Sequence, residues 1–127
     1  MRAGQDSPDP SVIGAFTDDY GNSFRISETL FEQLPHGRFQ IAEWHADERF
    51  FIAQNGASNP ADAGLWTRID WTPLDGMAPY TWAFCMTAYR AVTREAARAT
   101  PAADRATPRR GCNGHPFSRM KPAAPTP

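Results

Sequence analysis

Hydrophobic and polar residues alternate over short stretches of the first 89 residues, and turn-forming residues separate each stretch from the next. The stretches recur at spacings of about 8–12 residues, which is the pattern of short strands in an all-β sandwich or barrel. Seven strands are predicted in this way, at residues 11–17, 23–27, 29–34, 38–45, 49–54, 65–72 and 80–89. The connections are too short to hold a crossover helix, so the strands are expected to be antiparallel.

The predicted fold class is therefore all-β, an antiparallel meander of seven or eight strands. Consecutive strands pair with each other by default. Closing such a sheet into a barrel removes its exposed edges, so a barrel is favoured and a sandwich is the alternative.

The character of the chain changes after Tyr89. Residues 90–100 are rich in alanine and predict one short C-terminal α-helix that ends before Pro101. A basic, irregular loop is expected at 101–114. Residues 115–121 are a candidate eighth strand.

The length of 127 residues fits one domain. The barrel domain is predicted to span residues 11–121. Polar and proline-rich composition predicts disorder in the flanking segments 1–10 and 122–127.

The strand at 65–72 is the most informative for function. Its period-2 alternation places Trp66, Arg68 and Asp70 on one face, opposite Ile69 and Trp71. If the first face points outward, it forms a polar stripe on the surface. If it points inward, it lines a pocket suited to an amphipathic or sugar-like ligand. The candidate ligand-binding residues are the four tryptophans and this ion pair: Trp44, Trp66, Arg68, Asp70, Trp71 and Trp82.

The strand at 80–89 has a clearer division of faces. Tyr80, Trp82, Phe84 and Met86 alternate with smaller residues and are expected to face the core. Cys85 then faces the other side of the sheet, where the C-terminal segment is able to lie across it.

Only two cysteines are present, Cys85 in a predicted strand and Cys112 in a glycine-rich turn. Such a pair is plausible as a disulfide. It would close a loop of about 28 residues and stabilise the fold by roughly 3.5 kcal/mol on chain-entropy grounds. A disulfide implies an oxidising compartment, periplasmic or secreted. The alternative is two free thiols in a cytoplasmic protein. Residues 1–10 do not have the apolar region of a signal peptide.

The formal net charge of −1 hides an asymmetry. Residues 1–89 carry five Arg and twelve Asp or Glu, whereas residues 90–127 carry seven Arg, one Lys and two acids. The basic C-terminal segment is expected to fold back on the acidic body, and the alternative is a tail that binds an acidic partner. The overall charge predicts no general affinity for nucleic acid, and no run of residues is long enough to be a transmembrane segment.

No catalytic set, metal site or cofactor is predicted. Glu43 and His45 share one face of a strand, with Asp47 beyond it, but a third strong metal ligand is missing. Acid pairs drawn from Asp18, Asp19, Glu43 and Asp70 are too common in a chain with fourteen acids to indicate a hydrolase. The loop at 55–64 either only reverses the chain, as its turn-forming residues allow, or is a binding loop beside Trp66.

With these residues in view, the chain resembles a group of small uncharacterised bacterial β-proteins that are usually exported. The resemblance covers about residues 13–120, and its most specific piece is the run from Leu65 to Trp71. It also includes Ile52 to Asn55, the strand from Cys85 to Tyr89, and Gly111-Cys112. The resemblance implies export and a disulfide between the two cysteines, and it implies no catalytic residue.

A looser similarity connects the chain to lipocalin and avidin barrels. It rests on Gly14, Phe16 and the turn glycine Gly21. It favours a barrel that holds a small ligand.

The function expected from the sequence is that of a non-enzymatic, exported β-barrel domain that binds a small amphipathic or apolar ligand through an aromatic-lined pocket. The alternative is a protein–protein or cell-surface module with a fully packed core. An uncharacterised hydrolase is the third possibility.

Overall fold

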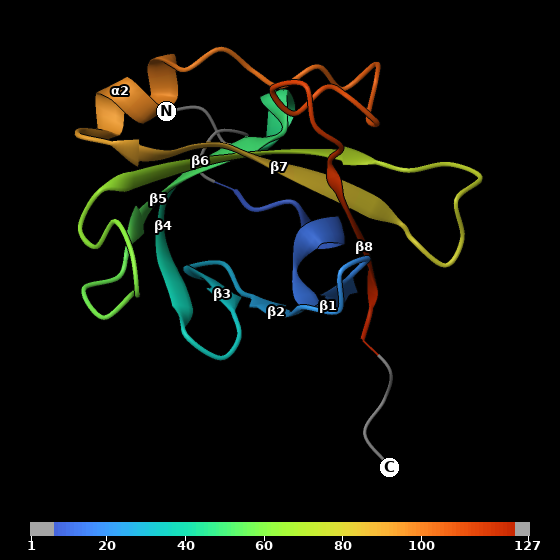
Figure 1. Cartoon of the computed structure of the whole chain (residues 1–127), viewed down its shortest axis with the longest axis horizontal. Helices are drawn as coiled ribbons and strands as arrows, with labels where there is room; N and C mark the ends of the chain where they lie inside the picture. Colours follow the sequence, from blue (N-terminus) through green and yellow to red (C-terminus); the bar gives the residue numbers. More distant parts are fainter. Residues whose placement is uncertain (1–6, 124–127) are drawn as a thin grey trace.

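The computed structural model describes residues 7–123 and consists of a single closed barrel of eight antiparallel strands. The barrel and its elements are drawn in Figure 1. The strands are β1 (Gly14–Asp18), β2 (Ser23–Ile26), β3 (Leu30–Gln33), β4 (Gly37–His45), β5 (Phe50–Asn55), β6 (Trp66–Pro73), β7 (Trp82–Ala91) and β8 (Ser118–Pro122). The helical elements are the 3₁₀ turns η1 (Pro10–Val12) and η2 (Ala46–Glu48) and the α-helix α2 (Arg94–Ala99).

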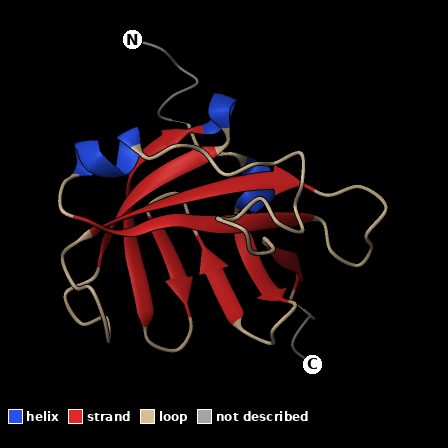
Figure 2. Cartoon of the chain, turned by 45° about the horizontal axis from the view of Figure 1, so that its top comes forward, coloured by secondary structure: helices blue, strands red, loops and turns tan. Residues whose placement is uncertain are grey.

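Strand order follows sequence order, so the predicted meander barrel is confirmed. Each strand pairs with the next, and β8 lies between β7 and β1 to close the ring. Residues 115–121 therefore contribute the eighth strand. Figure 2 shows the strands as one sheet curled on itself, with α2 at a corner of the barrel.

The interior of the barrel is filled by large rings. Phe31 is fully buried and contacts four other phenylalanine rings at centroid distances of 5.6–5.8 Å. Trp44 meets Trp71 edge-to-face at 5.7 Å, and Phe16 meets Trp82 in the same way at 5.2 Å. Rings in such edge-on and tilted arrangements attract each other beyond the burial of their area. The core is therefore an aromatic network that crosses from one side of the barrel to the other.

The N-terminal segment closes one end of this core. Val12 of η1 is 1% exposed and belongs to the core cluster. Asp9 caps η1 by accepting hydrogen bonds from the amide and hydroxyl of Ser11, and it also accepts one from the indole N–H of Trp71 at 3.2 Å. The prediction of disorder over residues 1–10 is wrong at Asp9 and Pro10 because of these contacts, and residues 1–6 lie outside the described part.

The other predicted boundaries need smaller corrections. The C-terminal helix was expected at 90–100 but spans only Arg94–Ala99, because β7 continues to Ala91 and Thr93 caps the helix through its side chain. The disordered tail was expected at 122–127, but Pro122 pairs with β1 and the amide of Ala123 donates to the carbonyl of Ala15 at 3.0 Å. Residues 124–127 lie outside the described part. In residues 7–123, no helix is long and apolar enough to cross a membrane.

Phe31→Ala should lower the free energy of unfolding by about 3–5 kcal/mol, because it leaves a cavity at the centre of the ring network. Urea unfolding followed by circular dichroism measures this loss. Val92→Ala is the control, since Val92 is 76% exposed and its truncation should change stability by no more than about 0.5 kcal/mol. Equal effects of the two substitutions would show that the network is not the core of the fold.

Candidate functional site

The structure brings three of the predicted ligand-binding tryptophans together, but as core residues. Trp44, Trp71 and Trp82 are 4%, 1% and 3% exposed and belong to the same cluster. Trp44 donates its indole hydrogen to the carbonyl of Glu28 at 2.8 Å. Trp44 packs on Trp71, and Trp82 packs on Phe16 and Phe84, so all three rings belong to the packed core. Trp71 and Trp82 also line a hollow of about 230 Å³ beside η1, and a ligand between the tryptophans stays a prediction.

Trp66, Arg68 and Asp70 do share one face of β6, as the alternation predicts. That face points away from the barrel interior, yet Arg68 is 5% exposed and Asp70 is fully buried. Neither the exposed stripe nor the interior pocket describes them. The chain after β7 folds over the outside of the barrel and covers these residues, with Trp66 packed beside Ala97 of α2.

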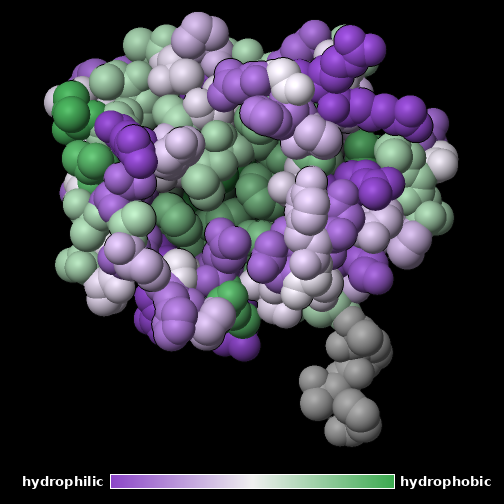
Figure 3. All heavy atoms as spheres, in the orientation of Figure 1, coloured by the Kyte–Doolittle hydropathy of each residue, from purple (hydrophilic) through white to green (hydrophobic). Residues whose placement is uncertain are grey.

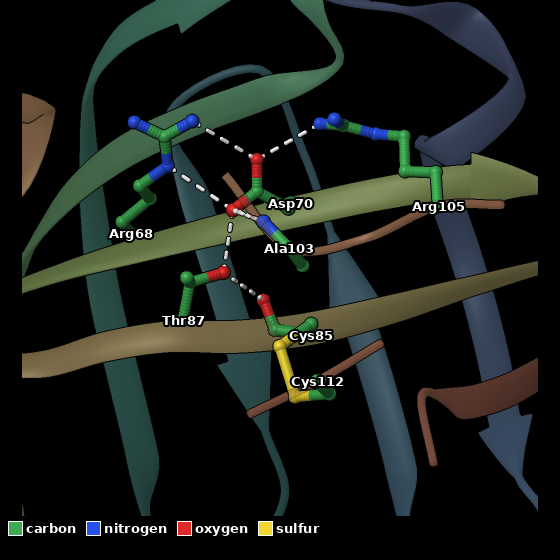
Figure 4. The surroundings of a disulfide bond; sticks show 7 residues. All are labelled: Arg68, Asp70, Cys85, Thr87, Ala103, Arg105 and Cys112. Atoms are coloured by element: carbon green, nitrogen blue, oxygen red, sulfur yellow. Dashed lines mark hydrogen bonds and ion pairs between the residues drawn. A yellow bond between two sulfur atoms is a disulfide. The ribbon is translucent and has the colours of Figure 1, made fainter. Parts of the chain in front are cut away.

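Asp70 is the centre of the polar contacts under this covering segment (Figure 4). Its carboxylate accepts two hydrogen bonds from Arg68, both 3.1 Å, and one from Arg105 at 2.8 Å. It also accepts hydrogen bonds from the hydroxyl of Thr87 and, at 3.4 Å, from the amide of Ala103. A buried carboxylate is tolerated only when its lone pairs are satisfied in this way. Asp70 therefore has a structural role.

Arg68 and Arg105 connect the same carboxylate to neighbouring elements. Arg68 donates to the carbonyl of Arg98 at 2.9 Å, and its guanidinium lies 3.7 Å from the ring centroid of Phe50. Arg105 donates to three backbone carbonyls around the start of β5 and the end of β6. Both side chains are thus occupied in holding the covering segment to the barrel.

The predicted disulfide between Cys85 and Cys112 is present, with a Cα–Cα distance of 5.5 Å. Cys85 lies directly opposite Asp70 in the β6–β7 ladder, so the covalent and ionic anchors of the covering segment are adjacent. Figure 4 shows Cys112 reaching β7 from this segment beside Thr87. A disulfide is consistent with an oxidising compartment.

A second ionic cluster surrounds Glu43 on β4. Its carboxylate accepts hydrogen bonds from Arg94 at 2.6 Å, from Arg98 at 2.6 and 3.0 Å, and pairs with His45 at 2.7 Å. The hydrogen bond from Arg98 is the main reason that the pKa of Glu43 falls to about 2, with His45 and Arg94 acting in the same direction and burial opposing them. The cluster attaches α2 to β4, so the basic C-terminal segment does fold back on the acidic body.

The other acidic residues considered in the sequence have structural partners in residues 7–123. No group of three or more His, Cys, Asp or Glu side chains is placed to hold a metal ion there. Asp18 accepts two backbone amides and the side chain of Asn22 in the β1–β2 turn, and Asp19 pairs with Arg119. Asp18 and Asp19 thus both stabilise the fold around the β1–β2 turn.

A hollow opens at the end of the barrel opposite η1, and we call it the mouth. Its volume is about 360 Å³. Phe39 and Met86, which pack against the core, form its floor, and Leu34 and Tyr89 contribute apolar walls. Figure 3 shows this face of the molecule hollowed near its centre, with apolar atoms on the floor and polar atoms around it. The mouth was not predictable from the sequence, because its residues come from separate turns and strands.

The rim of the mouth combines anchored and free polar groups. Asn55 fixes the loop that follows β5, donating to the carbonyls of Asp62 and Tyr89, both at 2.9 Å. In contrast, the side chains of Gln33 and His36 make no hydrogen bond or ion pair with any other residue in 7–123. The 55–64 loop thus belongs to the mouth more than to the surroundings of Trp66.

Asp70→Asn should lower the free energy of unfolding by about 3–5 kcal/mol, because it removes the charge that compensates buried Arg68. Chemical denaturation measures the loss. Glu32→Gln is the matched control, since Glu32 pairs with Arg38, whose side chain is 62% exposed, and such a pair contributes at most about 1 kcal/mol. A loss for Asp70→Asn as small as the control's would contradict the anchoring role.

Glu43 should make stability depend on acid pH. Its folded-state pKa of about 2 lies below the ordinary unfolded value of about 4.3, so its contribution is complete above the unfolded value and disappears as pH falls toward 2. Urea unfolding between about pH 5 and pH 2 should therefore show a steeper loss for the wild type than for Glu43→Gln. Parallel curves for the two proteins would rule out this linkage.

Comparison with protein-family models, with curated proteins and with solved structures found no match for this chain. The resemblance to small exported bacterial β-proteins therefore stays a prediction.

Proposed function

We propose that this protein is a non-enzymatic binding domain that holds a small amphipathic molecule in the mouth of its barrel. The observation that supports this best is the difference between the two ends. At one end η1 covers the core with Val12 and leaves a hollow of about 230 Å³ beside Asp9 and Ser11, whereas the hollow at the other end is about 360 Å³ and lies over Phe39 and Met86. This volume is within the range of small-molecule sites.

The chemistry of the mouth limits the ligand. Its apolar floor and the half-exposed ring of Tyr89 favour a flat or branched apolar body. Gln33 and His36 have free hydrogen-bonding groups at the rim. Asp62 is the acidic residue that lines the mouth, and it forms an ion pair with Arg90 at 3.3 Å, so the rim has little uncompensated charge. The expected ligand is a neutral, ring-sized molecule with one or two polar groups.

Export is part of the same proposal. The Cys85–Cys112 disulfide holds the covering segment to the barrel, and such bonds persist in oxidising compartments. This chemistry supports a periplasmic or secreted location, in line with the family resemblance of the sequence.

A protein–protein module is the second candidate. Tyr89 and Val92, near the end of β7, are 47% and 76% exposed, and the packed interior fits a domain that acts through its surface. A partner of this kind would use Val92 as well as Tyr89, whereas a ligand in the mouth would contact only Tyr89.

Methionine methyl NMR separates the mouth from the rest of the molecule. Met86 reports on the mouth and Met120, fully buried in the core, reports on global change. Titration with 2-naphthol, a neutral amphipathic probe, should shift the Met86 methyl signal in a saturable way and leave Met120 unchanged. Tyr89→Ala should weaken this binding by about fivefold, because it removes one apolar wall.

Val92→Ala is the control variant for this titration, since Val92 is exposed near Tyr89 but does not line the mouth. It should bind the probe like the wild type. An unchanged Met86 signal at saturating probe, or equal loss of affinity in the two variants, would contradict ligand binding in the mouth.

A further inference from the structure

A second hollow lies on the outside of the barrel, and we call it the outer groove. Its volume is about 660 Å³, and it shares no lining residue with the mouth. Three segments enclose it: the β1–β2 turn, the β6–β7 loop and the chain that leads into β8. In Figure 1 these segments lie at the right of the molecule, where the blue turn, the yellow loop and the red strand approach one another.

The base of the outer groove is apolar and firmly held. Phe117 is 2% exposed and packs with Cys85 on the outer face of the sheet, and Leu74 packs against the same cluster. The disulfide therefore fixes the base in position. Met77 adds a flexible apolar side chain from the β6–β7 loop, and Tyr20 stands at the edge with 69% of its surface exposed.

The charged groups of the outer groove are mostly positive. Arg109 lines it, is exposed, and forms no hydrogen bond or ion pair with another residue in 7–123. Arg119 donates to Asp19 at 3.0 Å, but its side chain is still 41% exposed. Asp19 is the one acid among the lining residues, so the guanidinium of Arg109 has no compensating charge there.

Tyr80, predicted as a core residue, instead lies outside the barrel and adds to this positive surface. The guanidinium of Arg119 lies 4.7 Å from its ring centroid, and the ammonium of Lys121 lies at 5.8 Å. Cation–π contacts hold both cations at the same side of β8. Lys121 pairs with no carboxylate within residues 7–123. The field beside the groove is therefore positive.

We propose that the outer groove is a binding site for a small amphipathic carboxylate. The carboxylate pairs with Arg109, whose planar guanidinium suits bidentate contact with two oxygens. The apolar body of the ligand lies over Phe117 and Leu74 and against Met77. The charge requirement distinguishes this ligand from the neutral molecule expected in the mouth.

The probe that tests the proposal is 2-naphthoate, with neutral 2-naphthamide as its matched analogue. Methionine methyl NMR on the whole chain detects binding at both hollows by chemical-shift changes, because Met77 lines the outer groove and Met86 lines the mouth. Naphthoate should shift the Met77 signal and bind about fivefold or more tightly than naphthamide, and the difference should shrink at high salt.

Arg109→Gln should lower the affinity for naphthoate to about that for naphthamide and leave the affinity for naphthamide unchanged. Arg110→Gln is the control, because Arg110 is the neighbouring exposed arginine and does not line the groove. It should bind naphthoate like the wild type. Three results would overturn the proposal: no shift of Met77 at saturating probe, equal affinity for the two probes, or equal effects of the two substitutions. Because the mouth is expected to take a neutral molecule, the Met86 response to naphthamide tests the mouth, and the Met77 response to naphthoate tests the outer groove. A missing Met86 response to naphthamide would contradict the mouth and leave the result for the outer groove unchanged.

Discussion

The packing of aromatic rings inside the barrel is the constraint on which the other features of the molecule depend. Phe31, Trp44 and Trp71 touch neighbouring rings from several strands, and each is almost completely buried. An interior packed in this way has few voids larger than a water molecule. Binding is then restricted to the ends of the barrel and to its outer face. At the end that η1 covers, the hollow is about 230 Å³, and the mouth at the opposite end is larger, at about 360 Å³.

The outer face of β6 and β7 is stabilised by polar and covalent contacts, in contrast to the aromatic interior. Its residues are polar, yet they are buried, because the chain after β7 covers them. Asp70 and Cys85 face each other across the ladder, so one ionic and one covalent anchor hold the covering segment at the same place. The Glu43 cluster adds a third attachment through α2. The asymmetry of charge along the sequence thus has a structural basis, and the same segment supplies one wall of the outer groove.

The strands could be predicted because alternation is a local property of the sequence. The division of β7 into core and outer residues followed from the same pattern, and so did the pairing of Cys85 with a segment beyond the sheet. Which distant segment covers a strand cannot be predicted from the residues of the strand itself. The alternation placed Arg68 and Asp70 on one face but could not reveal that Arg105 and Ala103 would bury them. The mouth was hidden for the same reason, since Phe39, Met86 and the loop at 55–64 meet only in the closed barrel.

The barrel interior is packed with rings, and free apolar surface of the barrel lies in the mouth. A crystal structure determined under xenon pressure tests it directly, because xenon enters dry apolar cavities and is visible by its electron density. The account predicts xenon on the floor of the mouth, against Phe39 and Met86, and none among Trp44, Trp71 and Trp82. A xenon site between those three tryptophans would contradict it.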